Sequence, residues 1–122
     1  MPISEAEAVV MDVLWRRHPQ GADDVVAALT ASTNWAEPTI KTLLNRLLNK
    51  GAIEAVKEGR RYLYSPVLAR EAWVAQQSEG LLQRLFDGRV APLVAHFSER
   101  GKLSAADVAE LKRLISEMDD GR

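Results

Sequence analysis

The sequence predicts a mainly α-helical protein with a small β-hairpin, in which a winged helix-turn-helix precedes a second helical region. The first observation is an amphipathic helix over residues 39–50, whose apolar side chains recur at helical spacing. The second is that two short β-prone runs, residues 52–58 and 61–65, follow this helix at once and flank Gly59. The third is a series of further helical patterns after Pro66. A chain of 122 residues with 47% hydrophobic content suits one small domain with a helical extension.

The helices that precede residue 39 are predicted from their ends. Ser4 and Glu7 have the spacing of a capping box and begin a first helix, which the proline and glycine of residues 18–21 interrupt. A second, shorter helix is expected over residues 22–30. Pro38 then lies in the first turn of the third helix, where a missing N–H costs little. The resulting order is helix, helix, turn, helix and hairpin.

The third helix has two chemically different faces. One is an apolar stripe that is expected to face a core: Ile40, Leu43, Leu44, Leu47 and Leu48. The other carries amide, hydroxyl and cationic groups without a carboxylate: Lys41, Thr42, Asn45, Arg46 and Asn49. Such groups bind base edges and phosphate oxygens in a DNA major groove. A helix whose polar face simply meets water has the same periodicity, so the helix alone leaves both interpretations open.

The distribution of charge favours a nucleic-acid partner. The whole chain has a net charge of −1, but residues 36–66 carry six basic and three acidic groups, a net +3. The flanking segments are net acidic, at −3 for residues 1–35 and −1 for residues 67–122. Three of the cations lie at the predicted hairpin tip: Lys57, Arg60 and Arg61. A local basic patch is typical of a specific DNA-binding protein. The alternative from another class is a winged-helix module that binds an acidic protein partner.

The C-terminal region predicts a dimerisation domain. Helices are expected over residues 69–86, around Pro92 and from Ser104 onward. Because so few residues cannot bury their own apolar stripes, a second copy of the chain is expected to cover them. We therefore expect a DNA-binding domain over residues 1–66 and a helical dimerisation domain over residues 67–122. The expected dimer contacts are Trp73, Leu81, Leu82, Leu85, Phe86, Leu93, Val94, Phe97, Leu111, Leu114 and Ile115.

Catalytic and metal-binding patterns are missing from the sequence. It contains no nucleophile elbow, no glycine-rich phosphate loop, no metal-ligand spacing of histidines and carboxylates, and no cysteine. We therefore expect no enzymatic activity, no cofactor and no bound metal. The chain also shows neither an apolar run of membrane-spanning length nor a cationic leader, which favours a cytoplasmic location without membrane insertion.

Four stretches together resemble the penicillinase repressor (BlaI/MecI/CopY) family of bacterial transcription factors: ISEAEAVVMDVLW, TIKTLLNRLLNKGAI, KEGRRYLYSP and RLFDGRVAPLVAHFSERGKLSAADVAELKRLI. The resemblance covers nearly the whole chain. It implies a homodimer that silences a promoter by occupying a palindromic DNA operator. The recognition helix of the family corresponds to residues 39–50 and its wing to residues 57–64. DNA contacts are accordingly expected at Thr39, Lys41, Thr42, Asn45, Arg46, Lys50, Arg60 and Arg61.

The resemblance also implies routes by which repression is relieved. In some members a membrane-bound sensor protease cuts an Asn-Phe bond in the dimerisation domain, and the corresponding bond here joins His96 to Phe97. The copper-responsive branch of the family uses C-terminal cysteines, which this chain lacks. A further departure is Pro38, which stands where the family often has a basic or small residue. We therefore expect that relief by cleavage between His96 and Phe97 requires a protease whose pocket is matched to histidine.

Overall fold

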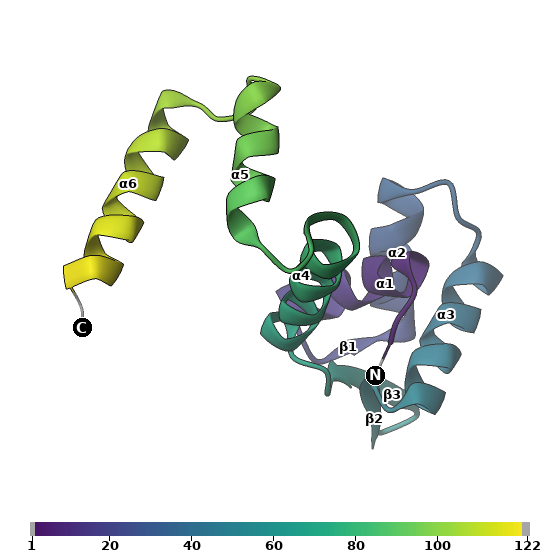
Figure 1. The fold of residues 1–122 in the computed structure, drawn as a ribbon. Helices are drawn as coiled ribbons and strands as arrows, with labels where there is room; N and C mark the ends of the chain where they lie inside the picture. The colour runs from purple at the N-terminus through teal and green to yellow at the C-terminus, as the bar shows by residue number, and fades with distance from the viewer. Residues whose placement is uncertain (1, 121–122) are drawn as a thin grey trace. The chain divides into compact units, whose positions relative to one another are not determined.

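The computed structural model describes residues 2–120 and confirms a mainly α-helical fold with a small antiparallel sheet. The chain forms two compact units, which divide between Val74 and Ala75 and are called here the N-terminal and C-terminal units. In chain order the elements are α1 (Glu5–Arg16), β1 (Gln20–Gly21), α2 (Ala22–Ser32), α3 (Glu37–Lys50), β2 (Ile53–Glu58), β3 (Arg61–Pro66), α4 (Arg70–Phe86), α5 (Val90–Glu99) and α6 (Ala105–Asp120) (Figure 1).

The sheet of the N-terminal unit has the strand order β1-β3-β2. The β2–β3 hairpin is the predicted wing, and its turn contains Gly59 at a φ of 64°, a left-handed conformation that glycine adopts without strain. The sequence does not predict β1, because a strand of two residues shows no periodicity. Gln20 and Gly21 pair with Tyr64 and Leu63 of β3. The segment between α1 and α2 therefore ties the wing to the helix-turn-helix.

The core of the N-terminal unit collects the apolar faces of α1, α2 and α3. The predicted stripe of α3 is confirmed, since Ile40, Leu43, Leu44 and Leu47 are all buried and Leu48 is half-buried. Burying each such side chain stabilises the fold by about 1.5–3 kcal/mol. The remaining buried apolar members of this core are Val10, Met11, Leu14, Val25, Leu29, Ala52, Ile53 and Leu68. With one face of α3 fixed inward, its polar face is held toward solvent.

A buried carboxylate fastens the C-terminal end of α3 to the beginning of α1. Glu7 completes the predicted capping box with Ser4 and is only 1% exposed. Its Oε1 accepts hydrogen bonds from the Ser4 backbone N–H at 2.7 Å and from the Lys50 ammonium group at 2.5 Å. Burial raises the pKa of Glu7, but the hydrogen bonds from Lys50 and Ser4 outweigh it and hold that pKa below its ordinary value. The pair therefore links two segments that are far apart in sequence.

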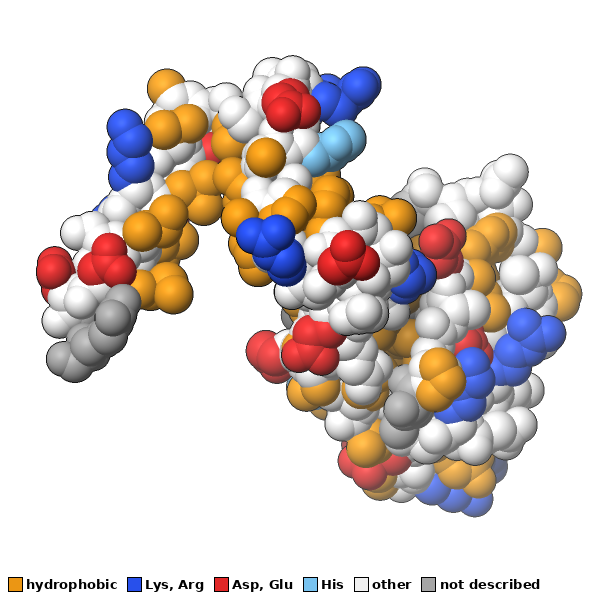
Figure 2. Space-filling model, in the orientation of Figure 1, with side chains coloured by type: hydrophobic (Ala, Val, Ile, Leu, Met, Phe, Trp, Pro, Cys, Tyr) orange, Lys and Arg blue, Asp and Glu red, His pale blue; other side chains and the backbone are white. Residues whose placement is uncertain are grey.

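The C-terminal unit is apolar at its surface. None of the residues of α4, α5 and α6 is fully buried. Leu85, Ile115 and Met118 are 66%, 58% and 71% exposed, which is unusual for such side chains. Figure 2 shows hydrophobic side chains gathered along the sides of α5 and α6 that face each other. Although these helices expose apolar groups, no helix within residues 2–120 combines the length and the apolar character needed to cross a membrane.

Candidate nucleic-acid interface

The polar face of α3 is exposed to solvent. Lys41, Thr42, Asn45, Arg46 and Asn49 are all exposed, while their apolar neighbours are buried. The N-terminal end of this face borders a shallow hollow of about 280 Å³, lined by Pro38, Thr39, Thr42, Leu43 and Arg46. The structure therefore brings three of the predicted contacts, Thr39, Thr42 and Arg46, together around this hollow, whereas Lys41 and Asn45 line a different hollow. Helices of this kind present base-contacting groups in the major groove.

A hydrogen bond within the first turns of α3 orients the hydroxyl group of Thr42. No side chain caps α3, because its N-cap residue is Ala36 and Pro38 occupies the first turn. The Thr42 hydroxyl donates a hydrogen bond to the Pro38 carbonyl oxygen at 2.9 Å. That bond uses the hydroxyl hydrogen and leaves the oxygen of Thr42 as an acceptor. At this position the side chain can accept a hydrogen bond from a ligand, and its methyl group is suited to apolar contact with thymine.

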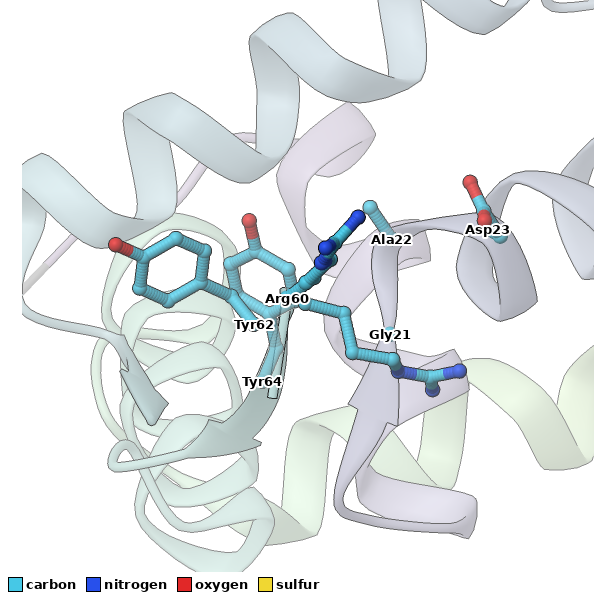
Figure 3. A pocket seen from close by; sticks show the side chains of 7 residues that line it. Gly21, Ala22, Asp23, Arg60, Tyr62 and Tyr64 are labelled. Carbon is cyan, nitrogen blue, oxygen red and sulfur yellow. The ribbon is translucent and has the colours of Figure 1, made fainter. Parts of the chain in front are cut away.

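The wing adds exposed cations beside the helix-turn-helix. Arg60 follows the Gly59 turn and Arg61 begins β3, and both side chains are exposed. A hollow of about 220 Å³ lies between the wing and the beginning of α2. Figure 3 shows this hollow with the wing side chains Arg60, Tyr62 and Tyr64 opposite Ala22 and Asp23. The wing therefore faces the N-terminal end of a helix, where the backbone dipole favours an anion.

Tyr64 connects the wing to α3. It lines the hollow beside the wing and also a second hollow of about 250 Å³, which Ala22, Lys41, Leu44 and Asn45 line as well. Neither Tyr62 nor Tyr64 is among the DNA contacts predicted from the sequence. The available signal is the alternation along β3, which places both tyrosines on one side of the strand. Tyr64, which lines both hollows, therefore joins the polar face of α3 and the wing into one connected surface.

Two cations of this surface are paired with carboxylates. Lys41 Nζ lies 3.0 Å from Glu37 Oε2 one turn earlier in α3, and the hydrogen bond from Lys41 to Glu37 raises the pKa of Lys41 above its ordinary value. Arg61 Nη2 lies 3.2 Å from Asp24 Oδ2 in α2. The sequence pattern does not reveal either partner, because Glu37 precedes the predicted helix and Asp24 lies on another element. Among the described residues, Arg46 forms no ion pair.

Lys50 occupies a different place from the other predicted DNA contacts. Its ammonium group donates to the buried Glu7 and also to the Pro2 carbonyl oxygen at 3.2 Å. Moving Lys50 onto a phosphate would leave the Glu7 carboxylate buried and unpaired, which is costly. The structure therefore places Lys50 at the junction of α1 and α3, and the prediction of a DNA contact for it rests on the sequence alone.

The predicted dimerisation residues lie in the C-terminal unit with one exception. Trp73 packs against Trp15 of the N-terminal unit, with ring centroids 5.5 Å apart. The others lie on α4, α5 and α6, where none is fully buried. Within this unit α5 and α6 enclose a largely apolar hollow of about 380 Å³, whose lining includes Leu93, Val94, Phe97, Leu111 and Leu114.

The predicted cleavage site lies on α5. His96 and Phe97 are both exposed, and their rings are 5.3 Å apart. The His96 ring also lies 6.1 Å from that of Phe86 on α4. The bond between His96 and Phe97 is within a helix, which a protease must unwind locally before it can cleave.

No ligand set for a metal ion is formed by the residues that the structure describes. Within residues 2–120 no three histidine or acidic side chains gather closely enough to hold an ion. The arrangement of the N-terminal unit, a cationic and amide-bearing helix face beside a basic wing, is suited to binding a polyanion by hydrogen bonds and ion pairs.

Comparison with known proteins supports this interpretation. Residues 3–117 match the family model described as penicillinase repressor. The penicillinase repressor of Bacillus licheniformis is 33% identical over 115 residues, which cover 94% of this chain and 90% of that protein. The solution structure of the DNA-binding domain of the repressor BlaI matches 57% of this chain and 85% of its own at 37% identity, with a TM-score of 0.54. The B. licheniformis BlaI monomer in complex with the blaP half-operator is 36% identical, with a TM-score of 0.54, and the match covers 59% of this chain and 88% of that one.

Proposed function

This chain belongs to the penicillinase repressor family, and from that premise we propose that it is a homodimeric repressor that silences a promoter by occupying a palindromic operator. DNA-binding transcriptional repression is the activity of the family, and a relative of this chain is known in complex with a half-operator. The observation that carries the proposal is the exposed, carboxylate-free stretch of α3 from Lys41 to Asn49, supported from behind by a buried leucine stripe.

The proposed DNA contacts form a reading surface of six residues: Lys41, Thr42, Asn45, Arg46, Arg60 and Arg61. On α3, Arg46 is suited to a bidentate contact with guanine or phosphate, and Asn45 to a contact with adenine. Thr42 offers an acceptor oxygen, and Lys41 a point charge for phosphate. Arg60 and Arg61 bind the phosphate backbone from the wing, which fixes the register of α3 but carries no sequence information. Thr39 lies at the edge of the same hollow as Arg46 and contributes at the rim.

The C-terminal unit supplies the second reading surface by dimerisation. Its exposed apolar side chains, such as Leu85 and Ile115, are covered when two copies associate around a two-fold axis. A two-fold dimer places its two α3 helices in major grooves about one helical turn apart, so the operator is a palindrome. Repression then follows because RNA polymerase and the bound dimer cannot occupy the same promoter DNA. The proposed activity is DNA binding rather than catalysis. The proposed location is the cytoplasm, where the target DNA lies.

Relief of repression is proposed to act on α5. Cleavage between His96 and Phe97 by a membrane-bound sensor protease separates Leu93 and Val94 from Phe97, all of which line the apolar hollow against α6. A protease pocket that hydrogen-bonds an asparagine amide discriminates strongly against other groups, so the protease that acts here must be matched to His96. Mass spectrometry of the repressor from induced cells tests this step, and an intact chain during full derepression would contradict it.

Salt-dependent binding is the test of the proposed function. Operator DNA is obtained by selection from genomic fragments, and its dissociation constant is measured by fluorescence anisotropy over a series of salt concentrations. Each phosphate contact that releases a counterion contributes about −0.9 to the slope of log affinity against log salt, so a dimer with several contacts gives a steep line. Preference for the selected palindrome over a scrambled duplex supports repression. Binding that is weak for every duplex but strong for an acidic protein would favour the interaction module instead.

A further inference from the structure

We infer that two carboxylates of the N-terminal unit restrain the sequence-independent binding of this repressor to DNA, by holding cations of the reading surface in the free protein. They are Asp24, which holds Arg61, and Glu37, which holds Lys41. The inference rests on the proposed function, and it adds two acidic residues that lower the affinity of the protein for DNA. Both residues act through a neighbouring cation and are therefore positioning residues.

The contact between Asp24 and Arg61 is built into the fold. Asp24 Oδ2 accepts a hydrogen bond from the Gly21 backbone N–H at 3.1 Å, which fixes the carboxylate at the beginning of α2. The same oxygen binds Arg61 Nη2 at 3.2 Å. The guanidinium group lies directly over Gly21, where a Cβ atom would come within 2.6 Å of Nη2. A residue with a side chain at position 21 would therefore displace the Arg61 guanidinium group, whereas glycine leaves room for it.

The pair remains within reach of a ligand. The side chains of Arg61 and Asp24 are 59% and 44% exposed, so a DNA phosphate can compete with the carboxylate for the guanidinium group. When it does, Arg61 releases a counterion from DNA, but Asp24 loses its partner and lies beside the phosphate as a like charge. Ion pairs as exposed as this one are weak, because water and salt screen the two charges. The restraint is therefore weak enough to be overcome on DNA and strong enough to measure.

The second pair, Glu37 and Lys41, also occupies a cation of the reading surface, on α3 rather than on the wing. Glu37 is the first residue of α3, and its Oε2 lies 3.0 Å from Lys41 Nζ, with both side chains at least half exposed. Its carboxylate lies at the N-terminal end of the helix that enters the groove in the proposed complex. Two of the four cations of the reading surface are thus neutralised in the free protein, whereas Arg46 has no ion pair among the described residues. Because phosphates carry no sequence information, the restraint acts on all DNA alike.

Asp24→Asn tests the inference, with Asp23→Asn as the matched control. Both changes remove one negative charge from the first turn of α2, but Asp23 forms no ion pair in the described part of the chain. Asparagine keeps an oxygen that can accept the Gly21 hydrogen bond. Binding of the full-length protein to a fluorescent duplex of random sequence is measured at about 0.1 M salt and over a salt series. We expect Asp24→Asn to tighten binding about two- to fivefold and to steepen the salt slope by up to about 0.9, and Asp23→Asn to have a smaller effect.

The dependence on Arg61 separates a direct pair from a general effect of charge. In an Arg61→Ala background the advantage of Asp24→Asn over Asp23→Asn should disappear. Glu37→Gln should act in the same way and lose its effect in a Lys41→Ala background. Equal binding by Asp24→Asn and Asp23→Asn, or an advantage that persists without Arg61, would overturn the inference while wild-type DNA binding stands. A wild-type protein that binds no DNA in a salt-dependent manner would overturn the proposed function together with it.

Discussion

Replacing Lys50 by methionine should destabilise the N-terminal unit, because it removes the partner of a carboxylate that the fold has buried. Glu7 is 1% exposed, and its Oε2 already has no hydrogen-bond partner among the described residues. Removing one member of a buried ion pair costs about 3–5 kcal/mol. Because the Lys50 side chain is 39% exposed, water compensates part of this loss, and we expect a decrease of about 2 kcal/mol in the free energy of unfolding. That corresponds to a fall of roughly 10 °C in Tm for a unit of this size.

The assay is thermal unfolding followed by tryptophan fluorescence. The three tryptophans, Trp15, Trp35 and Trp73, all lie in the N-terminal unit, so the signal reports its unfolding. Lys57→Met is the control, since Lys57 is an exposed cation of the wing without an ion pair in the described chain. The double variant Glu7→Gln/Lys50→Met should lose less free energy of unfolding than the sum of the two single variants. In the double variant the buried carboxylate and the ammonium group are both removed, so no unpaired charge remains.

The pH dependence of this effect follows from the pKa of Glu7. Its pKa is lowered in the folded protein, so the pair stabilises the fold above the ordinary carboxyl pKa of about 4.5 and the contribution is lost as the pH falls through the lowered value. The difference in Tm between the wild type and Lys50→Met should therefore narrow in acid. If Lys50→Met unfolds at the wild-type temperature but binds operator DNA more weakly, Lys50 is a DNA contact and its pairing with Glu7 does not stabilise the fold.

Three further predictions concern the proposed repressor activity. Arg46→Ala should weaken operator binding by about 1–3 kcal/mol and leave Tm unchanged, because an exposed side chain is lost and no cavity forms; unchanged affinity would remove Arg46 from the reading surface. Replacing Arg60 and Arg61 together by alanine should lower affinity for every duplex and flatten the salt slope by about one to two, whereas a changed base preference would mean that the wing enters a groove. A chain truncated after Val74, which keeps Trp73 on Trp15, should sediment as a monomer and bind the palindrome far more weakly; a full-length chain that is itself monomeric at micromolar concentration would contradict this.

Much of the fold could be predicted from the sequence because its strongest signals are local. The capping box at Ser4 and Glu7, the apolar stripe of α3 and the turn at Gly59 each depend on neighbouring residues, and the structure confirms all three. The strand β1 could not be predicted in this way. It exists because Gln20 and Gly21 meet β3, a contact between segments far apart in the chain.

The ion-pair partners within the candidate site could not be predicted either, because they also join segments that are far apart in the chain. The exposed cations of α3 and the wing follow from periodicity and turn position. The pairing of Arg61 with Asp24 and of Lys50 with Glu7 joins residues on different elements, and periodicity carries no information about such contacts. In the sequence, Lys50 is one more basic residue of the predicted recognition helix, whereas in the structure it donates a hydrogen bond to the buried carboxylate of Glu7.

Mapping the DNA contacts of the intact protein by NMR tests most directly whether α3 and the wing bind the operator. Amide chemical shifts are recorded while the selected operator is added, with a scrambled duplex of the same base composition as the control. We expect large changes on the polar face of α3 and at the wing tip near Arg60, small changes on the α1 surface around Val9, and a different pattern with the scrambled duplex. Changes confined to α1 or to the C-terminal unit, or the same changes with both duplexes, would show that α3 and the wing do not form a sequence-specific DNA interface.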